Sequence, residues 1–251
     1  RYVQPVRSEE AFPFEAVPVT KSGSMIPFDD PYNSAQWNLV NDGSAASDAV
    51  AGADVGVKDA WRLTGGDPSV IVAVFDCAVA HRHEDLEDAV WRNEPEINGT
   101  DDVDDDGNGF IDDKYGFNFV NCFAIDNDYA NGALEGKPQA AVDGNAVNSN
   151  KGVGHGTHVA GIIGATNGNG KGISSIAGGT GNGDGVRLMS CQIFEGNAYT
   201  TDAQSAMAFI YAADNGACIA QCSYGNYNPI ADDDTYLNGG MVGDTEIKGS
   251  P

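Results

Sequence analysis

The sequence predicts an α/β fold with a doubly wound, mostly parallel sheet. A continuous β-branched run, residues 70–75, is typical of a strand buried on both faces of a parallel sheet. Downstream, strand-like and helix-like segments alternate in the order β, α, β, α, β, which is the pattern of parallel βαβ units. In such open sheets chemistry gathers at the carboxyl edge of the strands, and the first run ends there on Asp76.

The remaining elements are predicted in chain order from periodicity, caps and turn residues. A helix over 45–63 should end at Gly65 and Gly66. Residues 93–150 are rich in Asn, Asp and Gly and are expected to form long surface loops, apart from a strand-like piece at 115–120. The later elements are a helix over 154–165, a strand over 186–194, a helix over 201–215 capped by Thr200 or Thr201, and a strand over 218–224.

Composition excludes several classes of protein. The chain has 251 residues, with 13 Lys plus Arg against 37 Asp plus Glu, so its formal charge of −24 repels phosphate backbones and no nucleic-acid partner is expected. No run approaches the roughly 20 apolar residues of a membrane-spanning helix. The 5 cysteines are odd in number and form no C-x-x-C pair, which indicates neither a disulfide framework nor a zinc site. Residues 1–30 lack sustained periodicity and are predicted to be an N-terminal extension or pro-segment remnant, and residues 31–251 to be the N-terminal part of the main domain.

Four landmarks carry a resemblance to the subtilase family of serine proteases. The run Val72-Ala73-Val74-Phe75-Asp76, followed by His83-Glu84-Asp85-Leu86, resembles the first family signature. The second signature is similar to His155-Gly156-Thr157-His158-Val159-Ala160-Gly161. Asp30-Pro31-Tyr32 with Gln36-Trp37 resembles the entry into the family's domain, and Tyr211 to Gly216 with Ser223-Tyr224-Gly225 resembles its substrate-binding region. These landmarks occur in the family's order over roughly residues 30–225, so the implied fold is subtilisin-like.

The resemblance implies a serine endopeptidase that hydrolyses peptide bonds. In that mechanism a Ser attacks the peptide carbonyl, a His takes its proton and an Asp orients the His. His155 would be the general base, because an imidazole exchanges protons near neutral pH, and Asp76 would hold its tautomer. A peptide or protein substrate would pair as an added strand with Ser223, Tyr224 and Gly225.

The nucleophile of this mechanism has no counterpart in the sequence. No segment resembles the family's Gly-Thr-Ser-Met-Ala motif or its oxyanion-binding Asn. Three explanations remain open: a shortened chain, a polypeptide nicked into two chains that stay together, and a pseudo-protease. We favour a companion C-terminal segment that carries both residues, which leaves the fold incomplete in its C-terminal half and this chain alone inactive. An open strand edge and an uncovered apolar face should result. The rival interpretation is a calcium-stabilised, catalytically inactive binding module with the subtilase fold.

Two local features allow other interpretations of the same residues. Cys77 and Ala78 follow Asp76 where family members have a small residue and then Gly, so the turn is bulkier than usual. Cys77 could be reactive if its pKa were lowered, although a small buried cysteine is the simpler expectation. His155 and His158 also form an H-x-x-H pair, which leaves a zinc hydrolase as a third class of function.

Acidic residues predict calcium as a structural cofactor. Residues 104–112 follow the start of a calcium loop, D-x-[DN]-x-[DN]-G, with oxygen donors on alternate residues, but Tyr115 stands where the bidentate Glu is expected. The alternative is a solvated acidic turn. Candidate ligands are Asp102, Asp104, Asp106, Asn108 and Asp112, with Asp102 or Asp113 expected to complete the partial loop. The resemblance implies a second site at Asp30, Asp85 and Asn169. Secretion or a cell-envelope location is a family-level expectation, since millimolar calcium is found mainly outside cells.

Overall fold

The computed structural model describes residues 26–120, 153–195, 198–224, 240–242 and 245–247. The chain divides into two compact units, Ala11–Ser223 and a smaller one formed by Arg1–Glu10 with Tyr224–Pro251. In the smaller unit, β7 (Gly240–Val242) and β8 (Thr245–Ile247) pair as an antiparallel hairpin. The larger unit contains the four-stranded sheet and both predicted catalytic residues.

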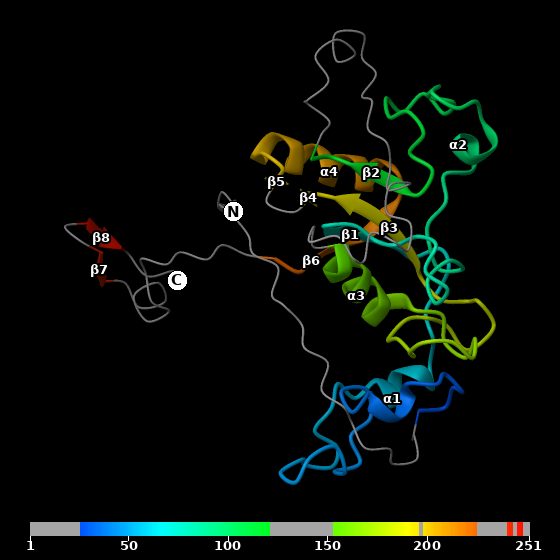
Figure 1. Ribbon diagram of the computed structural model, residues 1–251, viewed down its shortest axis with the longest axis vertical. Coiled ribbons are helices and arrows are strands. Elements are labelled where there is room, and N and C mark those ends of the chain that lie inside the picture. Colours follow the sequence, from blue (N-terminus) through cyan, green and yellow to red (C-terminus); the bar gives the residue numbers. More distant parts are fainter. Residues whose placement is uncertain (1–25, 121–152, 196–197, 225–239, 243–244, 248–251) are drawn as a thin grey trace. The chain divides into compact units, whose positions relative to one another are not determined.

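The larger unit is built on a parallel sheet of four described strands (Figure 1). Its strands are β1 (Ile71–Asp76), β2 (Gly116–Asn118), β3 (Arg187–Gln192) and β6 (Ala217–Cys222). Their order across the sheet is β2-β3-β1-β6, and every neighbouring pair is parallel. The predicted parallel α/β fold is therefore confirmed, and β1 lies between two other strands.

Strand β1 is buried on both faces, as its β-branched sequence predicts. Val72 and Val74 belong to a buried core cluster with residues of α3 (Val153–Gly164), including Ala160. On the opposite face, the ring of Phe75 stacks on Phe209 of α4 (Asp202–Asp214) with centroids 4.1 Å apart. Each buried side chain of this size stabilises the fold by about 1.5–3 kcal/mol. The strand that ends on Asp76 is thus held firmly from both sides.

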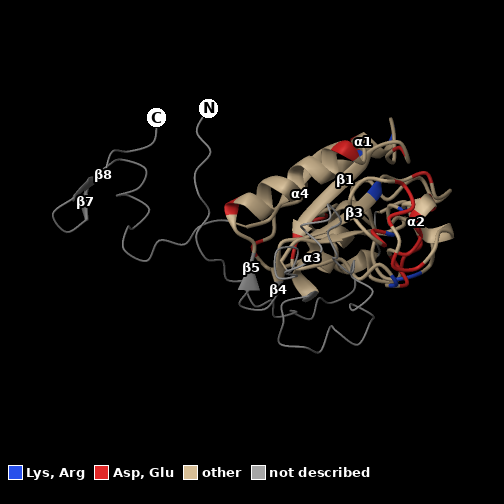
Figure 2. Cartoon of the chain, turned by 90° about the horizontal axis from the view of Figure 1, so that it is seen from above, with Lys and Arg blue, Asp and Glu red and all other residues tan. Residues whose placement is uncertain are grey.

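Two helices cover opposite faces of the sheet. Helix α3 contacts β1 and β3, whereas α4 contacts β6 and β3. Figures 1 and 2 both show these helices on opposite sides of the strands, so the sheet is doubly wound. Helix α4 begins with a capping box: Thr201 accepts from the backbone N–H of Gln204, and the Gln204 side chain accepts from the backbone N–H of Thr201. Thr201, one of two predicted caps, is the N-cap.

The prediction of a helix over 45–63 is wrong for most of its length. Only α1 (Val57–Trp61) is helical, because Gly52 and Gly56 adopt φ values of 78° and 67°, outside the right-handed region. The carboxylate of Asp54 accepts hydrogen bonds from the backbone N–H groups of Asn41 and Gly56, which holds this segment as turns.

The long loops between the two catalytic motifs also contain more structure than expected. A short helix, α2 (Glu94–Asn98), lies in the described part of this region, and residues 121–150 fall outside the described residues. The described part of the larger unit also contains η1 (Asn33–Ala35) and the antiparallel pair β4 (Phe194–Glu195) and β5 (Ala198–Tyr199).

Strand β6 forms one edge of the described sheet, next to β1. Its residues are mostly exposed, including Ile219 at 49%. Ile210 on the adjacent α4 is 62% exposed. Apolar side chains therefore face outward along this edge. In the described parts of the chain, no helix has both the length and the apolar character that crossing a membrane requires.

Candidate active site

Asp76 is the last residue of β1 and lies at the carboxyl edge of the sheet. Its backbone pairs in register with Gln192 of β3, and its carbonyl accepts from the backbone N–H of Ile193 at 2.9 Å. The residue is only 1% exposed. A carboxylate that is buried this deeply needs hydrogen-bond donors, because isolated charge is costly in the interior.

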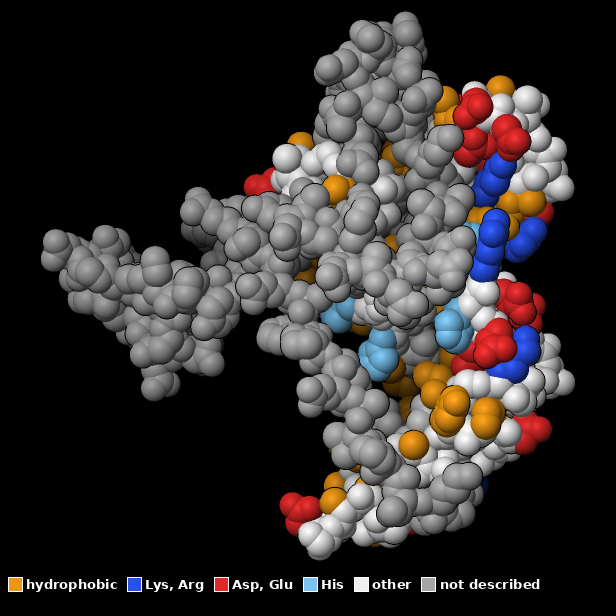
Figure 3. All heavy atoms as spheres, viewed as in Figure 1, with side chains coloured by type: hydrophobic (Ala, Val, Ile, Leu, Met, Phe, Trp, Pro, Cys, Tyr) orange, Lys and Arg blue, Asp and Glu red, His pale blue; other side chains and the backbone are white. Residues whose placement is uncertain are grey.

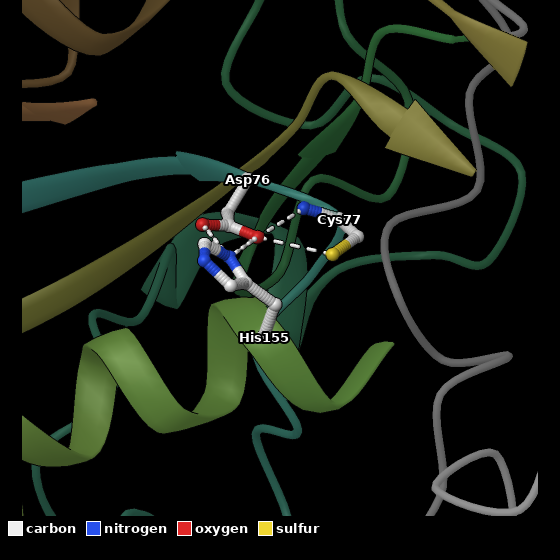
Figure 4. A group of neighbouring side chains, drawn as sticks. All are labelled: Asp76, Cys77 and His155. Carbon is white, nitrogen blue, oxygen red and sulfur yellow. Dashed lines mark hydrogen bonds and ion pairs between the residues drawn. The ribbon is translucent and has the colours of Figure 1, made fainter. Parts of the chain in front are cut away.

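The imidazole of His155 supplies such a donor. His155 lies in the first turn of α3, and its Nδ1 is 2.8 Å from Oδ2 and 2.9 Å from Oδ1 of Asp76 (Figure 4). Facing an acceptor carboxylate, Nδ1 carries the proton and donates it, which leaves Nε2 as an acceptor. The imidazole side chain is 28% exposed, so this pair joins a buried carboxylate to an accessible base.

Residues next to His155 hold α3 against the loop that follows Asp76. A β-carbon on Gly156 would overlap the backbone carbonyl oxygen of Ala78, so only glycine fits this contact. Thr157 Oγ1 accepts from the backbone N–H of Ala80 at 3.0 Å. The Gly and Thr of the His-Gly-Thr-His motif thus fix the distance between the two functional side chains.

Comparison with known proteins agrees with this geometry. Residues 67–248, more than half of the chain, match the sequence model of the subtilase family. The chain belongs to the subtilase family. This match includes both Asp76 and His155.

Curated relatives of this subtilase chain are considerably longer than it. Subtilisin-like protease 1 of Plasmodium vivax is 31% identical over 154 residues, which are 60% of this chain and 19% of that protein. The thermophilic serine proteinase of Bacillus sp. strain AK1 is 30% identical over 166 residues, 66% of this chain and 28% of that protein. Among solved structures, fervidolysin from Fervidobacterium pennivorans, a keratinolytic enzyme related to subtilisin, aligns with a TM-score of 0.47 and 24% identity. This alignment covers 80% of this chain and 22% of fervidolysin.

Cys77 is the least usual feature of this subtilase site. Its backbone N–H donates to Asp76 Oδ1 at 2.7 Å, and its thiol donates to the same oxygen at 3.0 Å. Burial, followed by the negative charge of Asp76, raises the pKa of the Cys77 thiol to about 12. Cys77 is therefore a neutral, 4% exposed hydrogen-bond donor at neutral pH, in agreement with the expectation of a small buried cysteine.

The turn after Cys77 is strained, as the missing glycine suggests. Ala78 has φ of 139°, in the region where a side chain is disfavoured. The backbone N–H of Val79 donates to Ser190 Oγ of β3, and this contact pins the turn to the sheet.

The H-x-x-H pair does not gather a zinc site. Within the described residues, no group of three clustered metal-ligating side chains includes His158, and His155 points to Asp76 instead. On the face shown in Figure 3, histidine side chains reach the surface near the middle, beside hydrophobic side chains.

The predicted substrate-binding residues lie at and beyond the end of β6. Strand β6 ends at Cys222, and Ser223 accepts a hydrogen bond from the Gln221 side chain at 2.9 Å. Tyr224 is assigned to the smaller unit, and Gly225 lies outside the described residues. Their role in binding substrate stays a prediction.

The predicted calcium loop brings two of its candidates together with a third carboxylate. Asp104 and Asp106 lie with Glu96 of α2 so that one oxygen from each falls within 4.8 Å of the others. Glu96 is buried and also accepts from the backbone N–H groups of Asp105, Asp106 and Asp112. Figure 2 shows acidic residues, coloured red, gathered along the chain beside α2. The calcium-loop pattern did not include Glu96, because Glu96 lies in α2, before the loop in the sequence, and only the fold brings it next to Asp104 and Asp106.

The other candidates of this loop make different contacts. Asn108 donates its amide to Asp106, whereas the Asp112 carboxylate accepts from the backbone N–H of Asp102 and pairs with Lys114 at 3.2 Å. Among the described residues, neither Asp102 nor Asp112 belongs to the group of clustered carboxylates.

Next to this loop lies the buried carboxylate of Asp113, one of the two residues expected to complete the loop. Asp113 accepts from the Tyr211 hydroxyl at 2.7 Å and from the side-chain amides of Asn93 and Asn108. Burial raises the pKa of Asp113 to about 6 despite these donors. Tyr211 belongs to α4, so the Asp113 contact ties the acidic loop to that helix.

The second predicted calcium set also comes together, around residues 166–175. Asp85 accepts from the Asn169 amide at 3.0 Å and from the backbone N–H of Ile173. Asp30 accepts from the backbone N–H groups of Gly168 and Gly170. Burial raises the pKa of Asp85, and the nearby charge of Asp30 acts in the same direction.

Proposed function

We propose that this chain supplies the general base and its orienting carboxylate to a serine endopeptidase. The observation that carries the proposal is the 2.8 Å contact between Nδ1 of His155 and the buried carboxylate of Asp76. Membership of the subtilase family supports serine-type peptidase chemistry. Peptides or proteins are the corresponding substrates.

The proposed mechanism follows from the position of the proton on the His155 imidazole. Asp76 accepts the Nδ1 proton and fixes the tautomer in which Nε2 of His155 is free to accept a proton from a serine hydroxyl. As Nε2 becomes protonated, the imidazolium is stabilised by the adjacent carboxylate, whose attraction is strong because Asp76 is excluded from water. The same imidazolium then returns its proton to the leaving amine.

A companion segment would contribute the serine and the oxyanion-binding asparagine. Strand β6 supports this proposal, because it forms an edge of the described sheet and exposes Ile219, and Ile210 of the neighbouring helix α4 is exposed as well. Further strands and helices placed there would remove this apolar surface from water. The nucleophile would then reach the carboxyl edge of the sheet, where Asp76 and His155 lie.

Calcium binding is part of the proposal as a structural cofactor. Three carboxylates within 4.8 Å repel one another unless a cation lies between them, and all-oxygen donor sets suit calcium. Glu96, Asp104 and Asp106 would hold the ion in the first loop, and Asp30, Asp85 and Asn169 are proposed for the second site. Such calcium-dependent stability fits a secreted or cell-envelope enzyme.

A fluorophosphonate probe, which reacts only with an activated serine, tests the proposed function. The wild-type preparation is labelled and examined by gel and intact mass. Label on a companion segment is expected, and its rate should fall by a factor on the order of 10⁴ or more in His155→Ala, in line with the loss of a triad member. His158→Ala is the matched control, because it removes an exposed histidine one helical turn away.

The probe also separates the rival function. Absence of label in a folded preparation that contains the companion segment would reject the protease and leave the catalytically inactive binding module. Equal labelling of the wild type and His155→Ala would reject the role assigned to His155.

A further inference from the structure

Three donor atoms of different chemical types converge at the end of β1. The thiol of Cys77 lies 3.0 Å from Asp76 Oδ1, and the imidazole Nδ1 of His155 lies 2.8 Å from Oδ2. One donor atom from each residue falls within 4.8 Å of the other two. Figure 4 shows the sulfur and the imidazole both directed at the carboxylate. Thiolate, imidazole and carboxylate are the three ligand types that bind zinc in proteins.

We propose that Asp76, Cys77 and His155 form an inhibitory site for a thiophilic divalent cation such as zinc. The ion would bind to Sγ, Nδ1 and one carboxylate oxygen, with water in the fourth position. Binding itself depends only on these three side chains, whereas the inhibitory effect rests on the proposed protease function.

The distances in the site suit an ion of this size. Zinc bonds of about 2.3 Å to sulfur and about 2.0–2.1 Å to nitrogen and oxygen place tetrahedral ligands about 3.3–3.6 Å apart. The present separations of 3.0 Å and 2.8 Å are hydrogen-bond lengths, so the donor atoms need to move apart by about half an ångström. A rotation of the partly exposed His155 ring would open a path to the buried sulfur.

The proton and charge balance of the site explains why binding of the metal ion would inhibit the protease. The ion displaces the Cys77 proton to solvent, and the resulting thiolate and the Asp76 carboxylate together neutralise its two positive charges. Coordination at Nδ1 moves the proton of the neutral His155 ring to Nε2. The nitrogen that must accept the proton of the serine is then already protonated, so the general base is lost while the ion remains bound.

The donor set also separates this site from the proposed calcium sites. Calcium takes 6–8 oxygen ligands, whereas this cluster offers one sulfur and one nitrogen. We therefore expect zinc, cadmium and cobalt to bind here, and calcium to leave the site unaffected. A chelator selective for zinc should restore activity without removing calcium.

Cobalt titration of the full chain in calcium-containing buffer tests the site directly. A bound thiolate should give a sulfur-to-cobalt charge-transfer band, and zinc at one equivalent should abolish it. Cys77→Ser keeps a hydroxyl that can donate to Asp76, but it should lose the band and weaken zinc binding at least tenfold. Cys218→Ser, which removes an exposed thiol elsewhere, should bind as the wild type does.

Other variants and an activity assay complete the test. His155→Gln should also weaken zinc binding, and thermal melts establish that each variant is folded. An unchanged band in folded Cys77→Ser, or no band in the wild type, would overturn the metal site whatever the enzyme does. Zinc binding without fluorophosphonate labelling would instead reject the protease and retain the site, and labelling that zinc does not reduce would reject inhibition.

Discussion

The backbones of Gly156 and Ala78 touch, and their contact sets the distance between α3 and the loop that follows Asp76. A β-carbon at position 156 would overlap the carbonyl oxygen of Ala78 and crowd the β-carbon of Asp76. The catalytic pair therefore depends on a glycine that takes no part in proton transfer itself.

Gly156→Ala should push α3 away from β1 and weaken the His155–Asp76 contact. Overpacking against backbone costs about 1–3 kcal/mol of unfolding free energy, and the rate of serine labelling should fall with it. Gly154→Ala is the matched control, because a β-carbon there meets nothing within 4 Å and alanine favours a helix. Urea unfolding measures both variants, and equal stability in the two would contradict the proposed role of the contact.

Ala78→Gly should stabilise the protein. The residue has φ of 139°, and strain of this kind costs about 1–3 kcal/mol, more than the roughly 0.4–1 kcal/mol that glycine loses through the unfolded state. We expect a gain of about 1 kcal/mol in urea unfolding. Ala80→Gly, in the same loop but without a positive φ, should destabilise instead. A loss of stability in both would show that the turn is unstrained.

Local patterns predicted the parts of the fold that local physics determines. The β-branched run of β1 and the capping box of α4 each lie within a few neighbouring residues, so the sequence alone indicates them. The helix prediction failed for the segment before α1 because the Asp54 carboxylate accepts a hydrogen bond from the backbone N–H of Asn41, 13 residues away, and this contact holds the segment as turns. Periodicity does not report such contacts.

The candidate active site and calcium sites show the same difference between local sequence patterns and long-range contacts. Asp76 and His155 were found because each belongs to a recognisable motif, although 79 residues separate them. Glu96 lies outside the calcium-loop pattern, and the contact between Asp113 and Tyr211 spans 98 residues, so the linear sequence indicates neither Glu96 nor this contact. Tertiary packing alone places these carboxylates.

Buried His81 should make the fold sensitive to acid. Its ring stacks on Tyr115 with centroids 4.5 Å apart, and neither ring nitrogen has a hydrogen-bond partner among the described residues. Burial, followed by the charge of Arg82, lowers the pKa of His81 below 6.5. The unfolded chain therefore binds the proton more tightly, and stability should fall as pH drops through 6.5, with a slope of at most about 1.4 kcal/mol per pH unit.

His81→Phe keeps the stacked ring and removes the titration, so the slope below pH 6.5 should become shallower. Urea unfolding between pH 7 and 5 provides the measurement. Parallel curves for the wild type and His81→Phe would assign the acid sensitivity elsewhere.

Tyr211→Phe should destabilise the junction between α4 and the acidic loop. It removes one donor from the buried Asp113 carboxylate, at a cost of about 1–3 kcal/mol when that carboxylate is charged. Because the folded pKa of Asp113 is raised from 3.8 to about 6, its protonation contributes stability at low pH that is lost as pH rises through this window. The penalty of the variant should thus be larger at pH 7 than at pH 5.

Tyr32→Phe is the control for this junction, since Tyr32 is an exposed tyrosine. Its unfolding free energy should match the wild type at both pH values. A Tyr211→Phe penalty that is the same at pH 5 and pH 7 would show that the hydroxyl does not act through the charge of Asp113.

Calcium removal should lower the melting temperature of the protein, and the size of this decrease should depend on Glu96. An ion that binds only the folded state adds about 2.7 kcal/mol when its concentration is 100 times its Kd. Glu96→Gln removes one of the three clustered carboxylates and should reduce the difference in melting temperature between calcium and chelator. Glu94→Gln is the control, because Glu94 lies on the same helix but pairs with Arg92, and this variant should show the wild-type difference. Differential scanning calorimetry measures the shift. A wild-type melting temperature that does not respond to the chelator would reject both calcium sites, and a full response in Glu96→Gln would move the ion away from Asp104 and Asp106.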